Sequence, residues 1–549
     1  MCRLMCEYGY STFVGWCTVK ARVYTRFREG APKLVRWFGT QLALAWHQRG
    51  TRRGFFGTLL IAIGSLSPAF LPRSSPFWAI FANAQSLATS PVVRLVGTGL
   101  AMAGALLLVS AWLRLRPRDR DGVASPDGEA AELGRVANWA VLVIWSIPFL
   151  AAPPIFSHDA YAYAAQGWLV HNQIDPYDVG PGFLPGAYAD QVDWVWRMSP
   201  APYGPLSLQI SHLLVDVTGD YPYLTAWAER VPALLGVLMI GLLLPKVARR
   251  AGADERFTTW FAMLNPMLVI SFIGGEHNDA LMMGFVVLAL WFAFWPGPAR
   301  WPRLSKWWWL VGALAIGVGA TVKQPALLTA YALPLIVRPW LNWRRREVLI
   351  TAGRVLLSFA VAAGGFAATT WATGLGYGWI HSIGVPGRNM TVAPTTMIGS
   401  GLAWVLDKLN PAVSHHGLVT GFQTVGTVIG VMIIVVLAIT VARRKPLTFL
   451  SFGYLVAAIA GPSLRTWYVQ WCVTLMPLAD MRARTVRIAV WGTLVMLGFD
   501  AGQMVLRNRA ISVGVAAMVL CAWIAWTHDR AHRHGLLDAA SEPAVGASR

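Results

Sequence analysis

The chain has 549 residues and a formal net charge of +20, yet only 13% of its residues are charged and 56% are hydrophobic. This composition excludes a soluble globular domain, in which about 25% of residues are charged. The apolar residues also form blocks long enough to cross a bilayer. The basic residues lie in short runs between these blocks, which is typical of a membrane protein and argues against a nucleic-acid partner. Five scattered Cys lack metal-ligand spacing, so we expect neither disulfides nor a zinc site.

Hydrophobic runs predict an all-α polytopic membrane protein with about 14 candidate spans, a number that could change by about two. Two of these segments, 325–338 and 468–480, are short for straight spans, and we expect them to be broken or re-entrant. The candidates lie near residues 55–72, 92–113, 136–155, 230–247, 257–273, 279–296, 307–322, 325–338, 348–372, 417–442, 447–463, 468–480, 486–506 and 510–527.

The flanking charges predict the topology. Basic clusters occur in alternate connections, which places these connections and both termini in the cytoplasm of a plasma-membrane protein. We expect a basic cytoplasmic or interfacial segment at 1–54, a membrane domain at 55–527 and a disordered cytoplasmic tail at 528–549. The longest outward connection, 156–229, holds one basic residue, Arg197, and eight acids.

The first candidate site begins this outward connection, in the sequence Ser157-His158-Asp159-Ala160-Tyr161-Ala162-Tyr163. A carboxylate at the membrane boundary beside aromatic rings can have a raised pKa and act as a general base. Aromatic faces also bind the C–H surfaces of sugars. The alternative is that Asp159 caps an interfacial helix and that the tyrosines belong to an aromatic belt.

Two further stretches carry polar and aromatic side chains in a rigid setting. The outward connection continues with Asp175-Pro176-Tyr177 and Pro202-Tyr203-Gly204-Pro205, and this pattern suits carbohydrate binding or a folded cap without a ligand. The sequence Glu276-His277-Asn278-Asp279 joins two spans, where such polar groups are costly and usually functional. We predict no metal there, because consecutive residues rarely converge on one ion.

Two cations are candidates for binding a lipid-linked phosphate. Lys323 lies in an apolar stretch and needs an anionic partner, which is either a phosphate or an internal carboxylate. Arg465 lies at the outward face, against the charge trend, and a guanidinium matches phosphate oxygens bidentately.

These motifs, in this order, resemble the actinobacterial polyprenyl-phosphomannose-dependent α-1,6-mannosyltransferases of the GT-C class, which build the mannan backbone of lipomannan and lipoarabinomannan. The resemblance covers roughly 136–480 and includes Ala165-Gln166-Gly167 and Lys323-Gln324-Pro325. Where the family suggests Arg-Pro-Trp-Tyr, this chain has Arg465-Thr466-Trp467-Tyr468.

The resemblance implies a GT-C fold with about 12–14 transmembrane helices and an extracytoplasmic active site with Asp159 as its catalytic acidic residue. It implies an inverting transfer of mannose from polyprenyl-phosphate-mannose to a mannan or lipomannan acceptor, with Lys323 or Arg465 offsetting the charge of the leaving group. A metal or other cofactor is not expected. The substrate-binding residues expected with Asp159 are Tyr161, Tyr163, Gln166, Asp175, Tyr203, Glu276, His277, Asn278, Asp279, Lys323, Arg465, Trp467 and Tyr468.

Two other functions fit the residues. A GT-C transferase that uses another polyprenyl-phosphate sugar has the same polar clusters, because only the family resemblance favours mannose. A transporter or flippase of a lipid-linked sugar typically has midplane polar residues and two-fold repeats. The polar clusters here gather mostly at one face and the sequence shows no repeat, which favours an enzyme.

Overall fold

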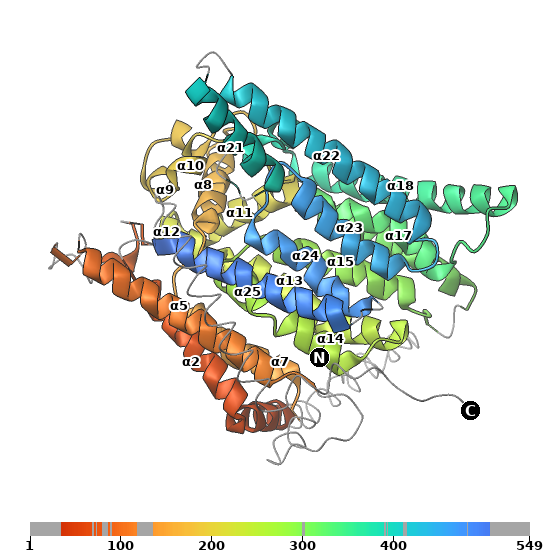
Figure 1. The fold of residues 1–549 in the computed structure, drawn as a ribbon, viewed down its shortest axis with the longest axis horizontal. Coiled ribbons are helices and arrows are strands. Elements are labelled where there is room, and N and C mark those ends of the chain that lie inside the picture. The colour runs from red at the N-terminus through yellow and green to blue at the C-terminus, as the bar shows by residue number, and fades with distance from the viewer. Residues whose placement is uncertain are drawn as a thin grey trace, which may run out of the picture.

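A computed structural model describes residues 35–67, 71–72, 74–79, 86–87, 90–117, 136–298, 302–388, 391, 393–409, 414–479, 481 and 483–505. Within these ranges the regular elements are all helical (Figure 1). The all-α prediction is therefore confirmed for the described part of the chain. The expected span at 510–527 and the expected tail at 528–549 lie outside the described residues, as do residues 1–34.

The longer helices form a bundle. They are α2 (Arg49–Gly64), α5 (Pro91–Arg114), α7 (Asn138–Leu150), α13 (Arg230–Ala251), α15 (Asp279–Phe294), α16 (Trp309–Ala320), α17 (Leu328–Val337), α18 (Arg345–Thr373), α21 (Pro394–Leu409), α22 (His415–Thr440), α23 (Pro446–Ala460) and α25 (Ala483–Val505). In Figure 1, α2 and α5 lie along each other at one edge, and α18 and α22 lie at the opposite edge.

The chain is a membrane protein. Among the described residues, four helical stretches are long and apolar enough to cross a bilayer. They are Pro91–Arg114, Pro222–Ala251, Arg345–Thr373 and His415–Thr440. Five shorter apolar helices of 10–17 residues accompany them. The segment expected at 468–480 contains only the short helix α24 (Val469–Leu475), followed by a 3₁₀ turn at Met476–Leu478, and that at 325–338 is a 3₁₀ turn followed by α17.

The span expected at 257–273 is broken rather than straight. Its two halves, Glu255–Met263 and Leu268–Gly274, meet at an angle of 59°. Pro266 lies at the break, where it removes a backbone donor and clashes with the preceding turn. The first half is fixed to α5, because the indoles of Trp112 and Trp260 stack at 5.0 Å and each donates to the other's carbonyl.

The connection at 156–229 folds into a compact cap of five helices at one end of the bundle, seen at the upper left of Figure 1. The five helices are α8 (Asp159–His171), α9 (Ala187–Asp190), α10 (Trp194–Arg197), α11 (Pro205–Thr218) and α12 (Pro222–Ala228). A small apolar cluster that includes Tyr161, Tyr188 and Val215 holds them together. The segment expected to be rigid is therefore folded, and its α11 contacts the start of α15, where Asn278 donates to Ser207. At the other end of the bundle, α2 begins at Arg49, ahead of the boundary expected at residue 55.

Candidate active site

Asp159 begins α8 and is only 7% exposed. Its backbone N–H donates to Ser157 Oγ, and the N-cap position of α8 belongs to His158, so Asp159 is the first helical residue and not the cap. The carboxylate instead accepts a hydrogen bond of 3.0 Å from the indole N–H of Trp196. Burial raises the pKa of Asp159 above its usual value, and the nearby Arg465 and Lys323 charges oppose that shift.

An imidazole faces this carboxylate. His277 Nδ1 lies 3.7 Å from Asp159 Oδ2 and has no hydrogen-bond partner. Burial, assisted by the charges of Lys323 and Arg465, lowers the pKa of His277 well below its usual value, so the ring is neutral at pH 7. The ring stacks on Trp467 at 3.7 Å, which fixes its orientation. A substrate hydroxyl between Nδ1 and Oδ2 would lie within hydrogen-bonding reach of both.

The candidate lysine, Lys323, is paired with a carboxylate of the protein itself. Lys323 Nζ donates to both oxygens of Asp279, at 2.9 and 2.8 Å, and Trp471 donates to the same carboxylate at 2.7 Å. The ammonium also lies 4.4 Å from the centre of the Tyr468 ring. Of the two partners considered for Lys323, the structure therefore shows the carboxylate.

Arg465 is different, because its guanidinium lies 5.2 Å from the ring centre of Trp196 and its Nη2 is buried without a hydrogen-bond partner. Trp196 thus contacts both the candidate base and this cation. A buried guanidinium N–H without a partner is costly unless a ligand supplies an acceptor. Arg465 is therefore the better placed of the two phosphate candidates.

Close backbone approaches bring these distant segments together. The N–H of Ile155 donates to the carbonyl of Gly274 at 2.7 Å, so the segment before Asp159 lies against the segment before His277. A Cβ at Gly204 would collide with the backbone of Thr321, and this contact places Tyr203 beside Lys323. Only glycine permits such an approach, which explains why a helix of the cap can begin directly beside α16.

Glu276 is buried, and its contacts stabilise the fold. Its carboxylate forms a fully buried ion pair with Arg230, whose guanidinium also donates to the backbone carbonyls of Ala152 and Ile273. The residue adopts φ +59°, a left-handed conformation that is unfavourable for a non-glycine residue. Arg230 therefore holds the turn that presents His277 to Asp159.

The other predicted residues are distributed unevenly. Tyr163 and Tyr203 form an edge-to-face pair at 5.1 Å within the cluster around Asp159, and Asn278 donates to Ser207. Gln166 is buried on α8, two turns beyond Asp159, with its Oε1 unpartnered. Tyr161 faces Tyr223 instead of the cluster. Asp175 is exposed and caps a turn by accepting from the N–H of Tyr177, so the structure does not bring it to Asp159.

Sequence reasoning missed Trp196, Trp471 and Arg230. The indole N–H groups of the two tryptophans donate to the two acidic side chains of the cluster. Arg230 begins α13, at the end of that span which the charge pattern predicts to face outward, so it departs from the charge trend. That is the same signal that singled out Arg465 and could have identified it.

Residues 51–342, more than half of the chain, match the family model described as alpha-(1->6)-mannopyranosyltransferase, N-terminal domain. The chain belongs to this family. The family and the enzyme class expected from the motifs, a membrane mannosyltransferase, are thereby confirmed.

Several curated relatives extend the match over most of the chain. A probable alpha-(1->6)-mannopyranosyltransferase of Mycolicibacterium smegmatis is 28% identical over 501 residues, covering 84% of this chain and 85% of its own. An alpha-(1->6)-mannopyranosyltransferase of Mycobacterium tuberculosis is 28% identical, with 87% of each chain covered. Alpha-(1->6)-mannopyranosyltransferase A of Corynebacterium glutamicum is 26% identical, covering 77% of this chain and 86% of its own. No solved structure matches the chain.

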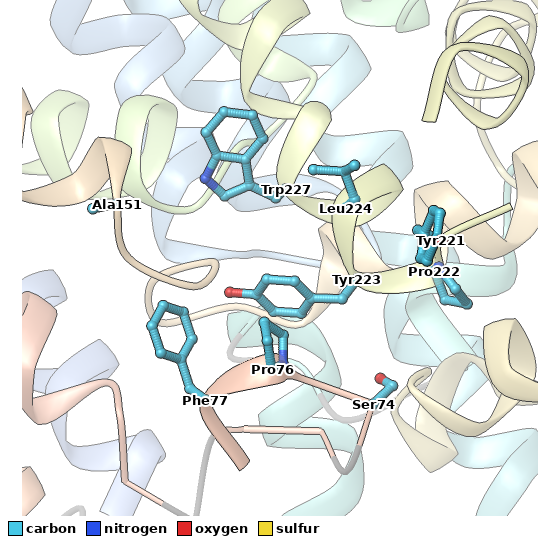
Figure 2. Close-up of a pocket in the computed structure, with 9 residues that line it drawn as sticks. All are labelled: Ser74, Pro76, Phe77, Ala151, Tyr221, Pro222, Tyr223, Leu224 and Trp227. Atoms are coloured by element: carbon cyan, nitrogen blue, oxygen red, sulfur yellow. The ribbon is translucent and has the colours of Figure 1, made fainter. Parts of the chain in front are cut away.

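This mannosyltransferase also has an apolar pocket of about 570 Å³ at the same end of the bundle (Figure 2). It lies between residues 74–77 and α12, with aromatic and aliphatic side chains around it. Its lining is Ser74, Pro76, Phe77, Ala151, Tyr221, Pro222, Tyr223, Leu224 and Trp227. Trp227 lies 5.6 Å from the guanidinium of Arg230, so the pocket adjoins the buried Arg230–Glu276 pair. Ligand pockets in proteins typically span about 300–1,000 Å³ and have mostly apolar walls.

Proposed function

We propose that the protein transfers mannose from polyprenyl-phosphate-mannose to a growing α-1,6-mannan of lipomannan or lipoarabinomannan, with Asp159 as the general base. The observation that carries the proposal is the buried Asp159 carboxylate with the unpartnered guanidinium of Arg465 nearby. One group can remove a proton from an acceptor hydroxyl, and the other can bind a phosphate. The relatives' names supply the sugar and the linkage.

In the proposed reaction, Asp159 accepts the proton of the acceptor's 6-hydroxyl as that oxygen attacks the anomeric carbon of the donor. The new C–O bond forms as the bond from carbon to the phosphate oxygen breaks. The electron pair leaves with polyprenyl phosphate, and a β-linked donor gives an α-linked product. A raised pKa makes Asp159 a better proton acceptor than an exposed carboxylate, while the neutral His277 ring can orient the hydroxyl.

The phosphate that leaves gains negative charge, and Arg465 is the group proposed to stabilise it. A guanidinium already positioned by Trp196 acts without reorganisation, which is how a fixed cation lowers a transition-state barrier. Lys323, neutralised by Asp279, contributes mainly by holding the Asp279 and Tyr468 side chains in place. The phosphate is a fair leaving group, and the proposal requires neither a strong general acid nor a catalytic metal.

The proposal includes a GT-C architecture with about 12–14 spans, both termini in the cytoplasm and the site on the extracytoplasmic side. It keeps the division into residues 1–54, 55–527 and 528–549. The clustering of the candidate residues in and beside the cap at 156–229, the acidic outward connection, supports this orientation. The apolar pocket beside α12 is suited to part of an isoprenoid chain, because its wall is almost entirely hydrocarbon.

The test compares the parent, Asp159→Asn and the matched control Asp178→Asn, since Asp178 is an exposed aspartate of the same cap. Each purified protein receives radiolabelled polyprenyl-phosphate-mannose and a short α-1,6-mannoside acceptor. We expect transfer by the parent and by Asp178→Asn, and a loss of at least about a hundredfold in Asp159→Asn, the scale of removing a general base.

Three results would contradict parts of the proposal. Equal transfer by Asp159→Asn would remove the base role from Asp159 but keep the activity. A parent that transfers glucose or arabinose from the corresponding polyprenyl phosphates, and not mannose, would indicate another sugar. Movement of the donor across vesicles without transfer would favour the transporter.

A further inference from the structure

The far end of α8 carries a group of side chains outside the candidate active site. His171, the last residue of α8, lies beside His212 and Asp216, which are one turn apart on α11. His171 Nδ1 lies 2.8 Å from Asp216 Oδ1, and His212 Nε2 lies 3.6 Å from Asp216 Oδ2. One potential ligand atom from each residue falls within 4.8 Å of the others. The three groups therefore lie close enough together to share one ion.

These distances suit a four-coordinate metal ion. Bonds of about 2.0–2.2 Å in tetrahedral geometry separate neighbouring ligand atoms by about 3.3–3.5 Å. The imidazole nitrogens lie 2.8 Å from Asp216 Oδ1 and 3.6 Å from Asp216 Oδ2, and one ligand atom of each residue lies within 4.8 Å of the others, so side-chain rotations would bring three ligands around one ion. Two imidazoles and one carboxylate leave a fourth position for water, and this ligand set favours Zn²⁺ over the oxygen-seeking Mg²⁺ and Ca²⁺.

The surrounding contacts hold the ligands in place. The His171 ring stacks on Trp168 at 5.1 Å, and Trp168 stacks on Tyr188 at 4.7 Å. The side-chain amide of Gln209 lies 3.1 Å from His212 Nδ1. With a metal on Nε2, Nδ1 is the N–H donor and the amide oxygen of Gln209 is its acceptor after a flip of the amide. Rings and hydrogen bonds of this kind orient metal-binding histidines.

We propose that His171, His212 and Asp216 bind a divalent transition-metal ion, with Zn²⁺ the best match, and that the ion clamps α8 to α11. Asp159 lies at the opposite end of α8, and twelve steps of 1.5 Å make that distance roughly 18 Å. The ion would therefore not touch the reacting atoms of the proposed transfer. It would hold the cap helix that carries Asp159.

The spacing of the cysteines predicted no zinc site. That expectation depended on closely spaced Cys and His, whereas His171 and Asp216 are 45 residues apart. The alternative is an ordinary histidine–aspartate ion pair at the C-terminal end of α8, where a cation is favoured. An ion pair requires no metal, so a measurement of metal binding distinguishes the ion pair from the proposed metal site.

The test uses the full chain without a polyhistidine tag, stripped with a chelator and titrated with ZnCl₂ in detergent. Bound zinc is measured by calorimetry, and amide hydrogen exchange is followed in α8 and α11. The variants are His171→Ala, His212→Ala and Asp216→Asn. The matched control replaces His532 and His534, two histidines of the C-terminal region, with Ala.

We expect about one equivalent of Zn²⁺ in the parent and in the control, and affinity at least about tenfold weaker in each of the three variants. Zinc should slow amide exchange at the end of α8 in the parent and in the control, and it should have no such effect in the three variants. Absence of binding in the parent would overturn the proposal, and so would binding that the three variants retain. Binding that only the control loses would place the metal in the C-terminal region and would overturn it equally.

Discussion

The two ends of α8 carry the same pair of side-chain types in opposite surroundings. At its beginning, Asp159 faces His277 across 3.7 Å, and the side chains are 10% and 1% exposed. At its end, His171 contacts Asp216 at 2.8 Å, and the side chains are 35% and 46% exposed. Burial at the first end penalises both charged forms and so favours an uncharged imidazole beside a proton-accepting carboxylate. Water surrounds the side chains at the second end and screens their charges. Any function there depends on how His171 and Asp216 are placed around a bound ion.

An imidazole and a carboxylate are therefore not a site by themselves. What separates the two ends is the set of additional partners. The buried end has an indole donor, an unpartnered guanidinium and a second acid–base pair around it. The exposed end has a second imidazole at metal-ligand distance. Catalysis is therefore proposed for the first end and metal binding for the second.

The largest effect on stability should follow from breaking the buried ion pair beside Asp159. Lys323→Met leaves the Asp279 carboxylate buried and without its cation. We expect a loss of about 3–5 kcal/mol in the free energy of unfolding, measured by denaturant unfolding in detergent. The double variant Lys323→Met/Asp279→Leu should recover much of it, because no charge is left uncompensated.

The control is an exposed pair in the same chain. Arg249 and Glu255 are 2.6 Å apart with side chains 70% and 40% exposed, and Arg249→Met should cost no more than about 1 kcal/mol. Equal losses from Lys323→Met and Arg249→Met would show that burial does not distinguish these pairs. The comparison between buried and exposed ion pairs would then be wrong.

The sequence predicted the membrane class and the residues that gather around Asp159, because apolar blocks and misplaced polar groups are visible one residue at a time. It predicted the break at 468–480 from length but not the 59° bend after Met263, because the segment at 257–273 is long and apolar enough on average for one straight span despite Pro266. Neither the indole that donates to Asp159 nor the choice between the two anions considered for Lys323 could be predicted. Indole donors and internal carboxylates are chosen by packing between segments that are far apart in sequence.

A smaller effect should appear in the pH profile of transfer. The indole N–H of Trp196 stabilises the ionised form of Asp159 and so opposes the rise in its pKa that burial causes. Trp196→Phe removes that donor, so the pKa of Asp159 should rise further. The base must be deprotonated to act, and activity is lost as pH falls through this pKa. The acid limb of kcat/KM should therefore move to higher pH.

Trp194→Phe is the matched control, because Trp194 belongs to the same short helix and is 71% exposed. Its acid limb should coincide with that of the parent. An unchanged limb in Trp196→Phe, with transfer still dependent on Asp159, would show that the indole does not set the protonation of the base.

The smallest effect belongs to the exposed end of α8 in chelator-treated protein. Without a metal, the His171–Asp216 contact is an exposed ion pair, so His171→Ala should lower the free energy of unfolding by no more than about 1 kcal/mol. The same substitution should cost more when zinc is present, because the parent alone then gains binding free energy in the folded state. The comparison requires unfolding of both proteins with and without ZnCl₂. A large loss of unfolding free energy without metal would mean that the His171–Asp216 pair itself holds α8. Equal small losses with and without ZnCl₂ would mean that zinc does not stabilise the contact between α8 and α11.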